Sequence, residues 1–238
     1  MSDFPAIESK LKTLLNLTRR PVAIRFSERA PEGMPAFRGK APAGCSFWKL
    51  AAEGRRFFTA QADHYNCAIG CHTHRIDLPQ DRAPELEQTL SLMEDIGYLK
   101  MEEVPDIARL EQSPSVVEYS PLAQARGTPD VVLLCGHPQS LSLVQEAAWR
   151  IGAQSPSALF GRPTCMALPA AMRGEVAAST ACIGNRVYTQ IDQQDLYIAI
   201  GGGNLDAILQ ALVVIVDANQ KLRDYHQGRA QNLSQAAT

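Results

Sequence analysis

Residues 130–136 read Asp-Val-Val-Leu-Leu-Cys-Gly, and this stretch indicates the fold more strongly than any other part of the chain. Five consecutive apolar residues, 131–135, are typical of a strand that is buried on both faces of a sheet. Pro138 ends the run, and residues 141–151 then place apolar side chains at helical spacing. A buried strand followed directly by an amphipathic helix predicts a mixed α/β fold.

The rest of the chain alternates short strands with helices in the same way. A second strand over 196–200 runs into three glycines and then into a long helix over about 205–225. Further elements are expected as helices at 6–18, 45–52 and 84–97 and as strands at 22–26, 57–59 and 116–119. No linker-like or low-complexity segment divides the 238 residues, so we expect one compact domain.

Two cysteine-bearing stretches resemble each other. Each begins with a cysteine, continues through an apolar run to a glycine nine residues on, and reaches a second cysteine beside Ile-Gly. The paired cysteines are Cys45 with Cys67, and Cys165 with Cys182. We therefore predict half-repeats over about 20–75 and 129–190, related by a pseudo-two-fold axis that brings the four thiols to one point. A chance likeness within an apolar chain is the alternative.

Composition narrows the setting of the protein. A formal charge of −2 and a pI near 6.2 give no general attraction to nucleic acid or to a membrane surface. No apolar run reaches the roughly 20 residues of a membrane-spanning helix, and no signal-peptide pattern is visible. We expect a cytoplasmic protein. In that reducing compartment its six cysteines should be buried apolar residues, nucleophiles or metal ligands.

Cys45, Cys67, Cys165 and Cys182 form the strongest candidate site. Four thiolates can hold an iron–sulfur cluster, in the [4Fe–4S] or [2Fe–2S] form, or a structural zinc ion. Glycines near these cysteines let the backbone approach closely and donate N–H groups to sulfur. The alternative is that the four are ordinary buried residues of separate helices.

Two other arrangements of the same region are open. Cys67, Cys71, His72 and His74 lie within eight residues and offer local zinc ligands, although their spacing fits neither a haem-attachment motif nor a zinc ribbon. A thiol-dependent enzyme is the other hypothesis. In it, His64 acts as an acid or base for the Cys67 thiolate, and Asp63 orients the imidazole.

Polar residues next to the second cysteine pair are candidate substrate contacts: Arg162, Asn185 and Arg186. A guanidinium suits carboxylate or phosphate recognition, so we expect a small anionic molecule here. Pairing with carboxylates of the protein, or balancing a negatively charged cluster, are the alternatives. Gly201, Gly202 and Gly203 lack the spacing of phosphate-binding motifs, and a turn into the following helix is the favoured interpretation.

Several short motifs extend these observations over most of the chain. They are Arg-Pro-Val-Ala at 20–23, Asp-His-Tyr-Asn-Cys at 63–67, Pro-Asp-Val-Val at 129–132, Gly-Arg-Pro-Thr-Cys at 161–165, Cys-Ile-Gly-Asn-Arg-Val-Tyr-Thr at 182–189 and Asp-Leu-Tyr at 195–197. In combination they resemble the prokaryotic family named domain of unknown function 169, DUF169. The resemblance implies the same four cysteines, whereas Cys71, His72 and His74 depart from the family pattern. The family name assigns no role, so no mechanism follows from it.

We therefore predict a cytoplasmic protein that binds an iron–sulfur cluster, or another metal such as zinc, through the four cysteines. Its expected role is electron transfer or redox chemistry on a small anionic molecule; an oxidoreductase activity is left open. The alternatives are a non-catalytic module that binds a small molecule or metal, and a thiol enzyme using Cys67 and His64. We expect a redox partner and a homodimer, and neither nucleic acid nor membrane as partners.

Overall fold

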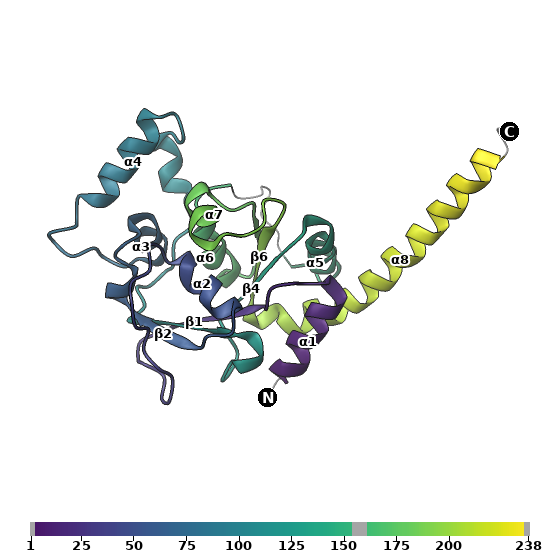
Figure 1. The fold of residues 1–238 in the computed structure, drawn as a ribbon, viewed down its shortest axis with the longest axis horizontal. Coiled ribbons are helices and arrows are strands. Elements are labelled where there is room, and N and C mark those ends of the chain that lie inside the picture. The colour runs from purple at the N-terminus through teal and green to yellow at the C-terminus, as the bar shows by residue number, and fades with distance from the viewer. Residues whose placement is uncertain (1–2, 154–160, 236–238) are drawn as a thin grey trace.

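The computed structural model describes residues 3–153 and 161–235, and a six-stranded sheet runs through it (Figure 1). The strands are β1 (Val22–Ser27), β2 (Phe57–Ala60), β3 (Val116–Pro121), β4 (Val131–Gly136), β5 (Val176–Ser179) and β6 (Leu196–Gly201). Their order is β2-β3-β1-β4-β6-β5, and all neighbours pair in antiparallel register. The predicted mixed α/β class and single compact domain are confirmed.

Strand β4 lies at the centre of the sheet, and all six of its residues are buried. Val132 and Leu134 pack into the core on one face, and Leu133 and Cys135 pack into a second core on the other. The apolar run predicted this double burial correctly. Burial on both faces is typical of parallel sheets, but this sheet is antiparallel. Here β4 is buried on both faces because a layer of helices covers each face.

The helices form one layer on each face of the sheet (Figure 1). The first layer contains α1 (Phe4–Leu15), α5 (Pro138–Arg150) and α8 (Leu205–Gln235). The second contains α2 (Cys45–Ala52) and α6 (Ala167–Met172), with α7 (Ile183–Thr189) packed on α2. Helices α3 (Ala68–His74) and α4 (Glu85–Asp95) follow on the side of β2.

The strand order is symmetric about the central β1–β4 pair. In each half the first strand is central, the third lies next to it, and the second forms the edge. A helix that starts at or just after a cysteine precedes each edge strand, and a cysteine-capped helix follows it. Gly54 and Gly174, both with positive φ, make the turns from helix to edge strand. A duplication would produce this symmetry. The half-repeats over about 20–75 and 129–190 stay a prediction, and the second includes 154–160, outside the described residues.

Helix α8 is longer than the sequence predicted, and its outer part leaves the body of the protein (Figure 1). Leu212 is fully buried, but Leu222 and Tyr225 are 57% and 59% exposed. The apolar stripe fades there, which is why the pattern placed the end near 225, whereas good helix formers and pairs such as Lys221–Asp217 continue the helix. Neither α8 nor any other helix in residues 3–153 and 161–235 combines the length and apolar composition needed to cross a membrane.

Deletion of residues 222–238 is expected to lower the free energy of unfolding by less than about 1 kcal/mol, because the described part of this segment is exposed and contributes little to the core. By contrast, Leu212→Ala should cost about 2–5 kcal/mol, since it opens a cavity in the core under α8. Urea unfolding at one protein concentration measures both. A loss on truncation as large as that of Leu212→Ala would mean that the outer helix is packed in solution.

Candidate metal centre

The four cysteines of the two repeat stretches all stand at the starts of helices. Cys45 is the first residue of α2, and Cys67 and Cys182 are the N-caps of α3 and α7. Cys165 lies in a short 3-10 turn, Thr164–Met166, that leads directly into α6. Helix starts carry N–H groups without helical partners and a partial positive charge, and both stabilise a thiolate.

Contacts between these elements bring the four cysteines together. Helix α2 packs against α7, and α3 packs against the 3-10 turn that holds Cys165. The backbone N–H of Cys182 donates to the Thr164 hydroxyl at 2.6 Å, which joins the start of α7 to that same turn. The contacts therefore link all four helix starts, two from each half of the chain.

The electrostatic interactions of the thiols indicate the same arrangement. Burial raises the pKa of the Cys45 thiol far above its ordinary value, and the nearby thiols of Cys67 and Cys182 raise it further. Burial also raises the pKa of Cys165, with additional contributions from Cys67, Cys182 and Cys45. These contributions place the thiols in one region of the protein, and their role as a set of four ligands stays a prediction.

Backbone donors lie next to these sulfur atoms. The N–H of Gly70 donates to Cys67 Sγ at 3.3 Å, and a Cβ at this glycine would stand only 3.1 Å from the same sulfur. Burial raises the pKa of Cys67, while the backbone N–H groups of Gly70 and Gly44 oppose that rise. Glycines thus let the backbone approach sulfur, as the sequence indicated.

One buried donor near the thiols, the Tyr119 hydroxyl, has no hydrogen-bond partner among the described residues. Burial raises the pKa of Tyr119, and the thiols of Cys45 and Cys165 raise it further. The Asn185 side chain acts on Cys45 in the opposite sense and lowers its pKa. An unsatisfied buried donor costs about 1–3 kcal/mol, and an anionic group next to the Tyr119 hydroxyl would remove that cost.

The donor set suits an anionic cofactor held by thiolates, yet it is not preformed for a single ion. Within residues 3–153 and 161–235, no group of three or more Cys, His, Asp and Glu side chains is placed so that it could hold a metal ion, and this includes the four cysteines. One zinc ion draws its sulfur ligands to about 2.3 Å, whereas a cluster of several irons spaces them more widely. The residue types, four thiols with backbone N–H groups nearby, suit an iron–sulfur cluster or zinc alike, and the cofactor stays a prediction.

In α3 the side chains of the local zinc candidate point in different directions and contact different partners. The Cys71 thiol is buried and donates to the backbone carbonyl of His64 at 3.2 Å. Burial raises its pKa to about 12. His74 is buried on another side, with its ring 5.5 Å from that of Phe26 and 5.7 Å from that of His64. Cys67, Cys71, His72 and His74 do not form a metal-binding group.

Cys67 and His64 lack the charges of an activated nucleophile and its base. Burial lowers the pKa of His64 to about 3, and its Nε2 lies 2.8 Å from the Thr59 hydroxyl. Asp63 accepts the backbone N–H of Ala60 at 2.8 Å, which accounts for its position. A reactive cysteine needs a lowered thiol pKa and a cationic neighbour, and neither condition is met here.

Native, metal-free protein is expected to be alkylated slowly at Cys45, Cys67 and Cys165. Because burial raises their pKa, the thiols stay protonated at neutral pH, and the rate should rise roughly tenfold per pH unit to beyond about pH 9. In the unfolded chain the rate should level off near an ordinary thiol pKa of about 8.5. Iodoacetamide labelling followed by mass spectrometry measures this. One thiol that reacts fast at neutral pH would support the thiol-enzyme hypothesis instead.

The predicted substrate contacts have partners inside the protein. Arg186 donates to four backbone carbonyls, those of Thr180, Asp192, Gln193 and Asp195. These bonds hold the loop between α7 and β6 and leave the guanidinium occupied. Asn185 is buried beside Cys45, and its backbone carbonyl accepts the Thr189 hydroxyl at 2.8 Å. The substrate roles of Arg186 and Asn185 stay predictions.

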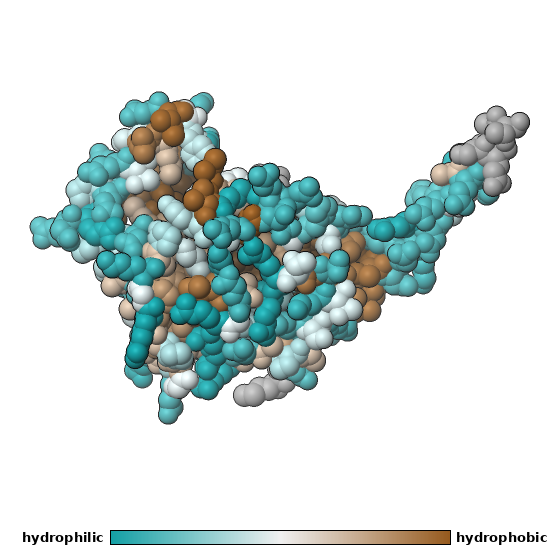
Figure 2. Space-filling model, viewed as in Figure 1, coloured by the Kyte–Doolittle hydropathy of each residue, from teal (hydrophilic) through white to brown (hydrophobic). Residues whose placement is uncertain are grey.

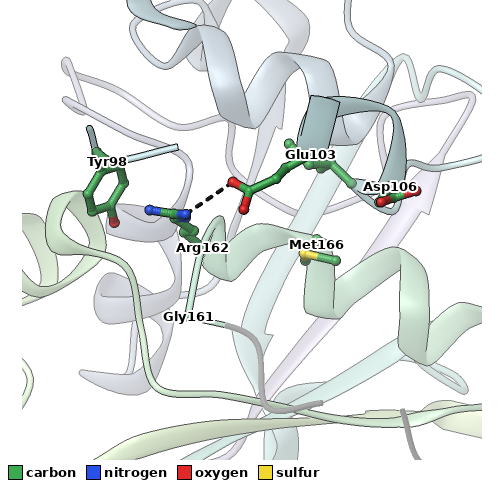
Figure 3. Close-up of a pocket in the computed structure, with 7 residues that line it drawn as sticks. Tyr98, Glu103, Asp106, Gly161, Arg162 and Met166 are labelled. Atoms are coloured by element: carbon green, nitrogen blue, oxygen red, sulfur yellow. Dashed lines mark hydrogen bonds and ion pairs between the residues drawn. The ribbon is translucent and has the colours of Figure 1, made fainter. Parts of the chain in front are cut away.

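Arg162 lines a pocket of about 480 Å³ next to the cysteines (Figure 3). The lining residues are Tyr98, Glu103, Asp106, Ile107, Gly161, Arg162 and Met166. The Arg162 guanidinium lies 3.0 Å from Glu103 and stacks 4.7 Å from the centre of the Tyr98 ring. Since this cation is already paired and Asp106 adds a negative charge, the pocket walls offer no free cation to an anionic ligand. Nothing in the sequence pattern connects Glu103 or Asp106 with Arg162, so sequence analysis missed this pocket.

Comparison with known proteins gives one match. The family model of DUF169, described as an uncharacterised ArCR family, matches residues 10–211 of the 238. No match was found among curated proteins or among solved structures. The matched region contains the whole sheet and all four cysteines, and it ends within the packed part of α8.

Proposed function

The chain belongs to the DUF169 family, whose description assigns no activity, and from the site itself we propose that it is a cytoplasmic electron-transfer protein with an iron–sulfur cluster. Cys45, Cys67, Cys165 and Cys182 would be the ligands. The observation that carries the proposal is the packing of the four cysteine-bearing elements against one another, beside the unpaired buried hydroxyl of Tyr119. The cluster would supply one-electron redox chemistry.

The surrounding residues would tune such a site. Hydrogen bonds to sulfur and the degree of burial are the main controls that a protein has over a cluster's potential. Gly70 already donates an N–H to the Cys67 sulfur, and the Tyr119 hydroxyl and the Asn185 amide would find acceptors in sulfur. Each donor stabilises additional negative charge and would therefore raise the potential.

An electron carrier is favoured over an enzyme acting on a small anion. Arg162 is paired with Glu103, and the Arg186 guanidinium is taken up by backbone carbonyls, so neither predicted cation is free for a substrate. Met166, the residue after Cys165, is part of the pocket wall, which gives the proposed cluster a short path to the surface.

Purification without oxygen tests the proposal. The visible spectrum, iron, zinc and sulfide per chain would be measured before and after reconstitution with ferrous iron and sulfide. About four irons and four sulfides per chain, with broad absorbance near about 400 nm, is the expected result. One zinc per chain without colour would point to a structural site, and a protein that binds no metal even after reconstitution would refute the cluster.

A further inference from the structure

Residues 85–106 project from the body beside the pocket (Figure 1), and their net negative charge is larger than that of the whole chain. This segment, which we call the acidic arm, consists of α4 and a 3-10 helix at Met101–Asp106. It contains seven acidic residues and one lysine, a net charge of −6, whereas the whole chain carries −2. The rest of the protein is therefore positive by four charges.

The acidic arm leaves large apolar side chains uncovered. Helix α4 buries only Leu90, while Leu92 and Ile96 are 60% and 69% exposed and Met101 is 40% exposed. Figure 2 shows this apolar surface in brown at the tip of the arm. A helix of this length is marginal in water without packing. Apolar side chains within a charged rim are typical of surfaces that bind another protein.

Helix α7 adds a second apolar patch close to the proposed cluster. Ile183 and Val187, one helical turn apart, are 66% and 63% exposed, and Tyr188 is 42% exposed. The residue before Ile183 is Cys182, one of the four grouped cysteines. A protein seated on this face would therefore stand one residue away from a proposed ligand of the cluster.

The pocket at the base of the acidic arm supplies a free carboxylate. Glu103 and Asp106 come from the arm, and Arg162 lies opposite, paired with Glu103 (Figure 3). Asp106 has neither an ion pair nor a side-chain hydrogen bond to any described residue. A lysine or arginine side chain from outside would find in the pocket a carboxylate to pair with and apolar walls for its stem.

We propose that the acidic arm and the exposed face of α7 form the docking surface for a basic partner protein, which inserts a lysine or arginine into the pocket against Asp106. The partner's role as an electron donor or acceptor rests on the proposed function, but the docking itself does not. Charge decides between occupants: a second copy would set one arm of −6 against another, and nucleic acid or an anionic membrane would be repelled.

Binding of cytochrome c, a small and strongly basic protein, tests the docking surface by calorimetric titration at low ionic strength. Glu87→Lys with Asp95→Lys reverses two exposed charges of the arm, and we expect it to weaken binding about tenfold or more. The matched control, Glu28→Lys with Glu32→Lys, makes the same change of net charge in the loop between β1 and α2. The control should change the Kd by less than about twofold. Asp106→Asn alone should weaken binding several-fold.

The apolar part is tested separately by Leu92→Ser with Ile96→Ser, against Leu222→Ser on the exposed part of α8. The arm pair should weaken binding without changing its dependence on salt, and the control should bind as the native protein does. If both charge pairs weaken binding equally, net charge alone attracts cytochrome c and the docking surface is refuted; the absence of binding refutes it too.

The titration needs no cluster, so its outcome is independent of the proposed function. Iron and sulfide content, measured on the same preparations, tests the cluster by itself. Where the cluster is present, the rate of cytochrome c reduction by the reduced protein should follow the same order of variants. If the arm variants weaken binding but leave the rate of cytochrome c reduction unchanged, electron exchange takes place at another surface.

Discussion

Cys165→Ser should produce a folded protein that has lost its cluster. The thiols of Cys67, Cys182 and Cys45 all raise the pKa of Cys165, and the turn that holds Cys165 joins α6 to α3. A serine hydroxyl is a poor substitute for a thiolate, and a four-cysteine site without one ligand cannot complete its coordination. We expect less than about one tenth of the iron and sulfide of the native protein.

Cys135→Ser is the matched control. Cys135 is also buried, at the end of β4, but its thiol belongs to the surroundings of Asp195 and Tyr197 rather than to the four-cysteine group. The control should keep its full iron and sulfide content after the same anaerobic reconstitution. Circular dichroism checks that both variants fold. Full iron in Cys165→Ser, or an equal loss in both variants, would contradict the assignment of the site.

The likeness of the two cysteine-bearing units is visible in the sequence because each cysteine pair brackets a helix, a turn and an edge strand; the half-repeats themselves stay a prediction. An apolar run, a glycine and a second cysteine beside Ile-Gly define a helix, a turn into an edge strand and the start of the next helix, and these are local features. The spacing therefore indicated which cysteines to group. The direction of strand pairing was not accessible in this way, since burial of β4 on both faces fits parallel and antiparallel sheets alike.

The roles of the arginines and the pocket depend on contacts that leave no pattern in the sequence. Arg186 is held by backbone carbonyls, and any residue type provides a carbonyl. Arg162 pairs with Glu103, which lies about sixty positions earlier in the chain. Glu103 belongs to the acidic arm, whose helix α4 buries a single side chain and so gives little apolar pattern to place it. The length of α8 was missed for a related reason: it depends on helix propensity and surface pairs, which continue after the apolar periodicity has ended.

Gly202→Ala is expected to lower the free energy of unfolding by at least about 3 kcal/mol. A Cβ at this position would stand 1.7 Å from the backbone oxygen of Pro129 and 2.9 Å from its carbonyl carbon, so it cannot be placed without moving the backbone. The Gly202 N–H also donates to the Asp130 carbonyl at 2.9 Å, and that bond would break as the segments before β4 and after β6 separate.

Gly203→Ala is the control one residue away, because a Cβ there meets nothing within 4 Å, and its unfolding free energy should change by less than about 1 kcal/mol. Urea unfolding of both variants decides what the three glycines are for. A large loss at Gly202 alone would assign the motif to the close approach of two chain segments at the centre of the sheet. Equal and small losses of unfolding free energy would mean that the two segments separate easily, and the close approach would then not explain the glycines.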